Sequence, residues 1–274
     1  MTSNARNILL RVAAWCSLAV TAPTLGGTQT LYDGSLNTSV SSQGWLRPTS
    51  SGYATTSVGF TNLDTTGTFN SVADNAASVG FSNYRSSGSL VNASFPDVDR
   101  SGSFTLQFTL KLVTESHDGS GGSTRGGYSA VLLASDHLGI ELAFHNDEIF
   151  AENDASSIGG IFSKGESSGT YDTTALHTFA LTIAGNGYVL ADGTQTVLSG
   201  TLRDYRTGGS SSALTNFYSL SNLVYLGDNT AAARSDSDLY SVGVTFPEPQ
   251  SVSALCAFVT ALGLTRSFRR GPTR

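Results

Sequence analysis

The sequence has little cysteine. Of its 274 residues only Cys16 and Cys256 are cysteines, and both lie in apolar segments near the ends. The long middle of the chain therefore contains neither a disulfide framework nor thiol chemistry. A zinc site is not expected either, because no metal-binding spacing connects the four histidines, which are His117, His137, His145 and His177.

Charged residues are also scarce, at 13% of the chain, and lysine occurs only as Lys111 and Lys164. Six of the 15 basic residues are arginines near the two ends, so the rest of the chain carries 9 basic residues against 21 acidic ones, a net charge of −12. A polyanion would be repelled by this charge, which excludes nucleic acid as a partner. The sequence also lacks a G-x-S-x-G elbow, a phosphate-binding loop and a dinucleotide fingerprint.

Alternating apolar and polar residues fill the middle of the chain. In "SFTLQFTLKLV", residues 103–113, every second residue from Phe104 to Leu112 is apolar. Similar stretches follow, separated by turn sequences such as "HDGSGGSTRGG", "HND", "AGNG" and "RTGGSSS". Short alternating strands at this spacing predict an all-β protein, and the length of about 215 residues favours a single jelly-roll β-sandwich. "AGNGYVLADGTQTVLSGTL" further predicts a hairpin closed by a type I′ turn at Asp192-Gly193.

The first 27 residues predict a secretory signal peptide. Arg6 and Arg11 precede an apolar run from Val12 to Val20, and small residues follow it. About nine apolar residues are too few to span a bilayer as a helix. We therefore expect this segment to direct export, which involves a signal peptidase, and not to belong to the folded domain.

The last 29 residues, 246–274, read as a second targeting segment. Pro247, Glu248 and Pro249 precede a mostly apolar run from Val252 to Leu264. A basic cluster follows, comprising Arg266, Arg269 and Arg270. The run is about 20 Å long as a helix, which suits a transient membrane anchor, and the arginines would keep the C-terminus in the cytoplasm.

This tail resembles the PEP-CTERM sorting signal of Gram-negative bacteria, and the chain resembles the surface proteins that carry it. The resemblance implies an exosortase as partner, a passage through the inner membrane and a final place at the cell surface or outside the cell. Between the ends, "LYDGSLNTSVSSQGWL", "GTLRDY" and "YLGDNT" resemble the choice-of-anchor Y type of these proteins. That resemblance implies a concanavalin A-like sandwich over residues 28–245, flanked by an N-terminal signal helix and a C-terminal hydrophobic helix.

The stretch "GIELAFHNDEIFAEND", residues 139–154, is the richest in functional side chains. A two-residue turn at Asn146-Asp147 would place Glu141 opposite Glu152 and put both on one face of a hairpin. Two opposed carboxylates are unfavourable unless an arginine, a cation or a sugar offsets their repulsion. This face defines the candidate ligand-binding residues, which are Glu141, His145, Glu148, Phe150 and Glu152.

A related group of glycoside hydrolases with concanavalin A-like folds carries Glu-x-Asp-x-Glu on such a face. Here Phe150 stands where that pattern has Asp, and Glu148 and Glu152 would lie roughly 13 Å apart along one strand. Glu141 and Glu152 would be near enough to cooperate. A solvated face with ordinary ion pairs, or a binding face for a glycan or a cation, remains an alternative.

No cofactor is expected, although calcium is an open alternative. Asp228 and Asn229 in "YLGDNT", and Asp97 and Asp99 in "FPDVDRSG", offer oxygen ligands. The same pairs are typical of ordinary turns and loops.

From these features the sequence predicts a non-catalytic, exported surface or matrix protein that contacts extracellular polysaccharide weakly. The alternative prediction is a glycoside hydrolase or polysaccharide lyase that uses Glu141, Glu148 or Glu152.

Overall fold

The computed structural model describes residues 26–49, 54–57, 59–64, 79–117, 125–207, 216–230 and 233–246. Residues 1–25 of the predicted signal segment, the Pro-Glu-Pro motif, the apolar run and the terminal arginines lie outside these ranges, and so do both predicted terminal helices. Gly27 and Phe246, which the sequence assigned to the two end segments, belong to strands of the sandwich. Within them, no helix is both long and apolar enough to cross a membrane.

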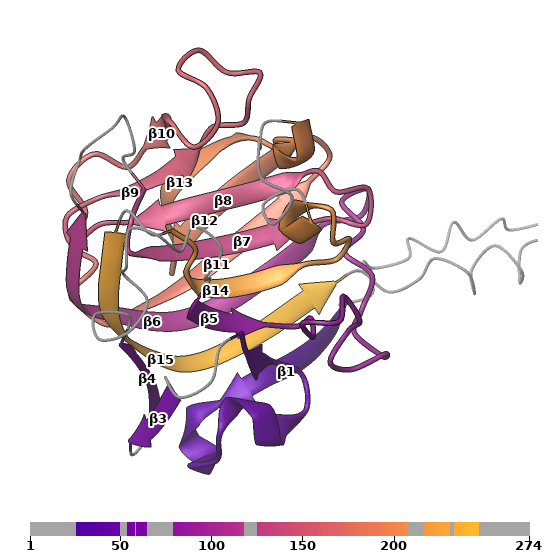
Figure 1. Cartoon of the computed structure of the whole chain (residues 1–274), viewed down its shortest axis with the longest axis vertical. Coiled ribbons are helices and arrows are strands. Elements are labelled where there is room, and N and C mark those ends of the chain that lie inside the picture. Colours follow the sequence, from indigo (N-terminus) through magenta and orange to yellow (C-terminus); the bar gives the residue numbers. More distant parts are fainter. Residues whose placement is uncertain are drawn as a thin grey trace, which may run out of the picture.

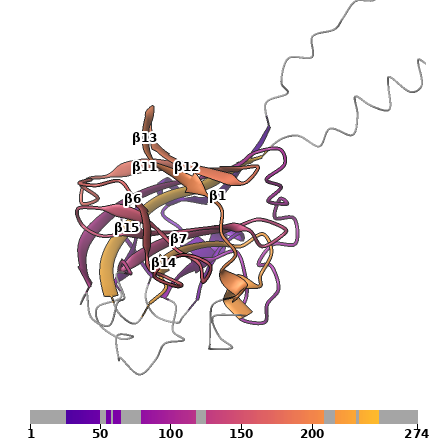
Figure 2. The same cartoon turned by 90° about the horizontal axis from the view of Figure 1, so that it is seen from above.

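Two antiparallel sheets stack face to face (Figures 1 and 2). The eight-stranded sheet has the order β13-β12-β11-β6-β15-β4-β3, with β1 also paired to β15. Its strands are β1 (Gly27–Asp33), β3 (Ala54–Ser57), β4 (Phe60–Asp64), β6 (Phe104–His117), β11 (His177–Ala184), β12 (Gly187–Asp192), β13 (Gln195–Thr201) and β15 (Ala233–Phe246). This arrangement confirms the predicted jelly-roll β-sandwich of the concanavalin A-like kind.

The seven-stranded sheet has the order β10-β9-β8-β7-β14-β5-β2. Its strands are β2 (Arg47–Pro48), β5 (Val79–Ser82), β7 (Tyr128–Leu133), β8 (Gly139–Phe144), β9 (Ile149–Glu152), β10 (Lys164–Ser167) and β14 (Val224–Asp228). Short 3-10 helices η1 (Gly34–Leu36), η2 (Val40–Gln43) and η4 (Tyr205–Thr207) lie in the connections. Because sheet neighbours are often distant in sequence, most of the pairing is non-local.

The main core fills the space between the sheets. The alternating apolar residues of β6 all point into it and are buried, as the sequence predicts. Phe108 of β6 and Phe179 of β11 meet Phe144 of β8 across the interface, with ring centroids 5.4 to 6.2 Å apart. Tilted and edge-to-face ring contacts of this kind stabilise the packing beyond simple area burial.

A second apolar cluster covers the opposite face of the seven-stranded sheet. We call it the outer cluster, and its buried members are Val131, Leu133, Tyr205, Tyr218, Leu223 and Tyr225. Residues of the strands and of the connections together shield this face of the sheet from water. Polar groups beneath the outer cluster are therefore buried as well.

One predicted turn is wrong. In the β12–β13 hairpin Asp192 pairs with Gln195, so the two turn residues are Gly193 and Thr194. Only Gly193 has a positive φ, at 56°, whereas a type I′ turn requires positive φ at both positions. Asp192 instead ends β12, where its carboxylate contacts His177.

Candidate functional site

The β8–β9 hairpin has the predicted register. Phe144 pairs with Ile149 and Leu142 with Ala151, and the His145 amide donates to the Glu148 carbonyl across the turn. Glu141 and Glu152 therefore lie opposite each other on the outer face of the sheet, in agreement with the alternation of the sequence. Both are fully buried beneath the outer cluster and its neighbours.

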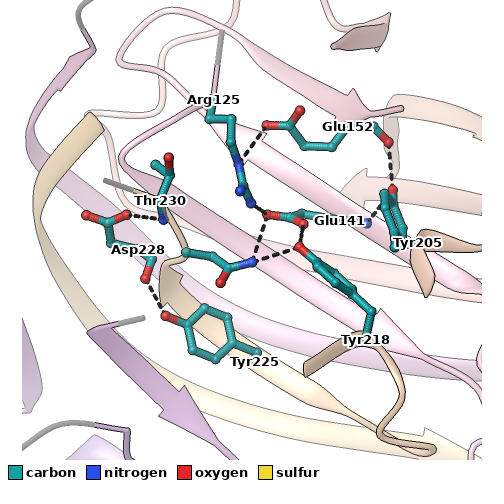
Figure 3. A network of polar contacts seen from close by, with 9 residues as sticks. Arg125, Glu141, Glu152, Tyr205, Tyr218, Tyr225, Asp228 and Thr230 are labelled. Atoms are coloured by element: carbon teal, nitrogen blue, oxygen red, sulfur yellow. Dashed lines mark hydrogen bonds and ion pairs between the residues drawn. The ribbon is translucent and has the colours of Figure 1, made fainter. Parts of the chain in front are cut away.

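Arg125, which precedes β7, lies between the two carboxylates (Figure 3). Its Nη2 is 2.5 Å from Glu141 Oε1, and its Nε is 3.8 Å from Glu152 Oε1. Burial alone would lower the pKa of Arg125, but Glu141, Tyr218 and Glu152 raise it overall. The guanidinium thus supplies the positive charge that two opposed carboxylates need.

Glu141 accepts a dense set of hydrogen bonds. Besides Arg125, its carboxylate receives the Tyr218 hydroxyl and the Asn229 side-chain amide (Figure 3). The Asn229 amide also donates to the Tyr218 hydroxyl, at 2.8 Å. These partners fix the Glu141 carboxylate in one orientation.

Glu152 has a contrasting environment. Among the residues that the structure describes, neither of its carboxyl oxygens has a hydrogen-bond partner. Burial, with a further contribution from Glu141, raises its pKa well above the usual glutamate range, against the opposing effect of Arg125. Glu152 therefore holds a proton where an exposed glutamate would have lost it.

Aromatic side chains close the site. The Phe162 ring lies over the guanidinium of Arg125, with 3.9 Å between the ring centroid and Cζ. The Tyr205 hydroxyl donates a hydrogen bond to the Glu152 carbonyl and accepts one from the Glu141 amide. Tyr205 thereby connects β8 with β9 on the outer face of the sheet. Phe162 stacks against Tyr205 and also contacts Tyr218.

The other predicted ligand residues lie at the turn end of the hairpin. Glu148 contacts Lys164 and Ser167 of β10, and hydrogen bonds from these two residues lower its pKa although partial burial acts in the opposite direction. Phe150 is buried, with the Lys164 ammonium 4.9 Å above its ring and the His145 ring 4.9 Å away. The structure therefore brings Glu141 and Glu152 together and places Glu148 in a separate ion pair.

The residues considered as calcium ligands lie in turns and in network contacts, and calcium binding stays an open prediction. The Asp228 carboxylate accepts the Thr230 amide, and the Asp228 carbonyl accepts the Tyr225 hydroxyl (Figure 3). Asp99 accepts both the amide and the hydroxyl of Ser101, which closes a local turn. Asn229 contributes to the Glu141 network, a role that the sequence did not indicate.

An open cavity of ≈530 Å³ is lined by residues of β2, of β5 and the turn after it, and of the segment before β14. Its lining includes Arg47, Arg85, Tyr84 and Phe217. Phe217 packs edge-on against Tyr218, with centroids 5.0 Å apart, and so connects the cavity wall to the residue whose hydroxyl binds Glu141. No sequence pattern indicated this cavity, because its lining comes from three separate segments.

The chain matches no protein-family model, and no curated protein matches it in sequence. Its structure is similar to that of a conserved carbohydrate esterase from Shiga toxin-encoding bacteriophage phi24B, with a TM-score of 0.50, 15% identity, and coverage of 81% of this chain and 100% of the esterase. The TM-score is 0.42 for an alginate lyase of polysaccharide lyase family 7, at 14% identity, covering 81% of this chain and 95% of the lyase. The TM-score is 0.44 for the Crh5 transglycosylase in complex with NAG, at 12% identity. This match covers 82% of this chain and 86% of the transglycosylase.

The comparisons correct one prediction. The prediction of a non-catalytic surface protein is contradicted, because the named esterase, whose fold this chain shares, is an enzyme. The sequence placed the two carboxylates opposite each other, but their burial and their partners become visible only in the folded chain. At this level of identity the similarity establishes the fold.

Proposed function

We propose that this chain is a carbohydrate-active enzyme that cleaves glycosidic bonds in a polysaccharide, with Glu141 and Glu152 as the reacting carboxyl groups. The observation that carries the proposal is the unequal pair of buried, directly opposed carboxylates on the outer face of the seven-stranded sheet. One is paired with Arg125, and the other keeps its proton through a raised pKa.

Glycoside hydrolysis uses one protonated carboxyl group and one ionised carboxylate, and this pair provides both. Glu152 is the general acid that donates a proton to the leaving oxygen, and Glu141 is the carboxylate that attacks the sugar or activates water. Opposed residues on paired strands have Cβ atoms about 5 Å apart, and a retaining mechanism needs its two carboxyl groups at about the same separation. Arg125, Tyr218 and Asn229 position Glu141 for this role.

The cavity lined by β2, β5 and the segment before β14 favours an anionic polysaccharide. Arg47 and Arg85 bring positive charge to its wall in an otherwise acidic chain, while Tyr84 and Phe217 offer ring faces for a sugar. Guanidinium groups bind carboxylates in a bidentate manner, so a uronate is a suitable ligand. The named alginate lyase and carbohydrate esterase support the same substrate class by analogy.

Access requires movement of the cover. Phe162 and Tyr205 lie between the reacting groups and solvent, so a substrate must displace the Phe162 ring to reach Glu152. Phe162 lies at the end of the loop between β9 and β10 and has a positive φ of 61°, an unusual conformation for a bulky residue.

The test is an assay of the full chain against acidic and neutral polysaccharides, read by new reducing ends and by the absorbance of unsaturated uronates. Glu152→Gln should reduce turnover at least ~100-fold, the usual effect of losing a general acid. Glu148→Gln, on the same hairpin but paired with Lys164, is the matched control and should retain activity. Equal loss in both variants, or no product from any substrate, would contradict the proposal; unsaturated products would identify a lyase.

We also propose that the enzyme is exported and sorted through its two ends. Support comes from the sequence of the ends and from the pairing of Gly27 with Phe246, which brings both ends of the sandwich to one place. Mass spectrometry of the mature protein from envelope and medium fractions tests this. A chain that is intact at both ends and confined to the cytoplasm would contradict it.

A further inference from the structure

Three metal-binding side chains meet at one end of the sandwich, away from the Glu141–Glu152 pair. Glu115 and His117 come from the end of β6, in the eight-stranded sheet, and His145 follows β8 in the other sheet. Their ligand atoms all lie within 4.8 Å of one another. We propose that Glu115, His117 and His145 bind a divalent transition metal ion such as Zn²⁺. This site is independent of the proposed activity.

The donor set suits such an ion. Two imidazoles and one carboxylate are the protein ligands of many zinc sites that keep one position for water. Imidazole favours zinc, copper or nickel over calcium and magnesium, which prefer oxygen ligands alone. The oxygen-ligand alternatives for calcium considered from the sequence lie elsewhere in the chain.

The spacing between donors is also appropriate. Glu115 Oε2 lies 3.1 Å from His117 Nδ1, close to the ~3.4 Å between two ligand atoms of a tetrahedral zinc ion with bonds of ~2.1 Å. A metal ion bound by these two atoms therefore needs little change in their separation. Glu115 Oε1 accepts the Gly127 amide, which leaves the carboxylate oriented toward His117.

The two histidine rings are stacked, with centroids 3.7 Å apart and planes 6° from parallel. Because a bound metal lies in the plane of each ring, one ring must rotate. The His117 side chain is 37% exposed and can do so, whereas the Glu115 side chain is 1% exposed and fixed.

Contacts from three segments hold His145 in place. The neighbouring Asn146 side chain donates to the Glu115 carbonyl, which ties the β8–β9 turn to β6. The Thr173 hydroxyl donates to the His145 carbonyl, and the Thr173 amide donates to the Asn146 carbonyl. The site is thus largely formed before an ion arrives, which lowers the cost of binding.

The experiment uses the full chain without an affinity tag, with Cys16→Ser and Cys256→Ser so that no thiol competes for metal. After chelator treatment, Zn²⁺ is titrated by calorimetry, and Co²⁺ is added to read the ligand set from its visible spectrum. We expect one equivalent of Zn²⁺ per chain and a rise in Tm, because an ion that binds only the folded state stabilises it. Ca²⁺ should produce neither effect.

His117→Ala should abolish this equivalent, and because His117 is exposed the variant should stay folded. His145→Ala should also abolish the bound equivalent of Zn²⁺. His177→Ala is the matched control and should keep the metal, since His177 belongs to a separate pair with Asp192. Absence of stoichiometric Zn²⁺ binding, or a stoichiometry that His117→Ala leaves unchanged, would overturn the proposal.

Discussion

Glu141 and Glu152 show how two identical residues, opposite each other, acquire different chemistry. Glu141 has an arginine, a tyrosine hydroxyl and an amide as partners, whereas the oxygens of Glu152 have no hydrogen-bond donor. A buried carboxyl group without hydrogen-bond donors favours its protonated form. A buried carboxyl group that accepts several hydrogen bonds favours its ionised form. Their mutational effects should therefore differ in sign as well as in size.

Glu141→Gln should destabilise the fold by about 3–5 kcal/mol, because it leaves the buried charge of Arg125 without its main partner. Urea unfolding at neutral pH measures the change. Glu148→Gln removes a more exposed partner of Lys164 and should cost at most about 1 kcal/mol. Similar losses in the two variants would show that Arg125 does not depend on Glu141.

Glu152→Gln should become stabilising relative to the parent as pH rises. The raised pKa of Glu152 means that, above about pH 4.3, the unfolded state loses the proton while the folded state keeps it. The contribution of Glu152 is therefore fully present below that pH and is lost as pH increases toward the folded pKa. Urea unfolding between about pH 5 and pH 8 should show a steeper decline for the parent than for the variant; parallel curves would refute the assignment.

Sequence reasoning reached part of this site. The alternation within residues 139–152 was enough to place the two glutamates opposite each other, and an arginine was among the groups expected to offset their repulsion, a role that Arg125 fills. Tyr218 and Asn229 could not be predicted as partners, because they are 77 and 88 positions from Glu141 in the sequence. They come close to Glu141 only because β14 and its flanking segments lie near it in the folded chain. Full burial of the glutamates was also not predictable, since it depends on the cover.

At the scale of elements, the loop between β9 and β10 determines access to the site. Phe162, at its end, covers Arg125, while Ile158 in the same loop is fully exposed. The loop thus contains Phe162, which contacts Arg125, and Ile158, which is exposed to solvent. Mutations of the two residues can therefore be compared within one loop.

Phe162→Ala should open the cover and destabilise the protein by about 1–2 kcal/mol, through loss of the ring contact with Arg125 and of packing on Tyr205. Hydrogen exchange followed by mass spectrometry should show faster exchange for the loop and the ends of β8 and β9. Ile158→Ala is the matched control and should leave both measurements unchanged. Unchanged exchange in Phe162→Ala would mean that other residues hold the cover closed.

Elements with strict alternation were the ones that sequence predicted well. β6 is an example, with all its alternate apolar residues in the core. The type I′ turn was wrong because Asp-Gly marks a turn without fixing which two residues form its centre. The short strands β2, β3 and β5 had no signal of their own, since a few residues can join a sheet only when neighbours are already in place.

At the scale of the whole molecule, β15 holds the eight-stranded sheet together. It pairs with β6 and β4 and, through its second half, with β1. Consequently β6, whose residues form much of the core, has a complete set of strand neighbours only when residues 233–246 are present.

A chain of residues 26–246 should unfold cooperatively with a Tm close to that of the full chain, since it retains every described strand. A chain of residues 26–230, which lacks β15, should show no cooperative transition, because the long inner strands would be left with unpaired edges. Differential scanning calorimetry distinguishes the two. A cooperative melt of the shorter chain would mean that β15 is dispensable.

The position of β15 also has a consequence for biosynthesis. A ribosome releases this strand after every other described strand, so the eight-stranded sheet cannot complete its pairing before residue 246 has emerged. Sheets assembled from distant segments are slow to form and expose aggregation-prone intermediates in the meantime. Any chaperone that keeps the nascent polypeptide from aggregating must therefore stay with it until β15 has emerged.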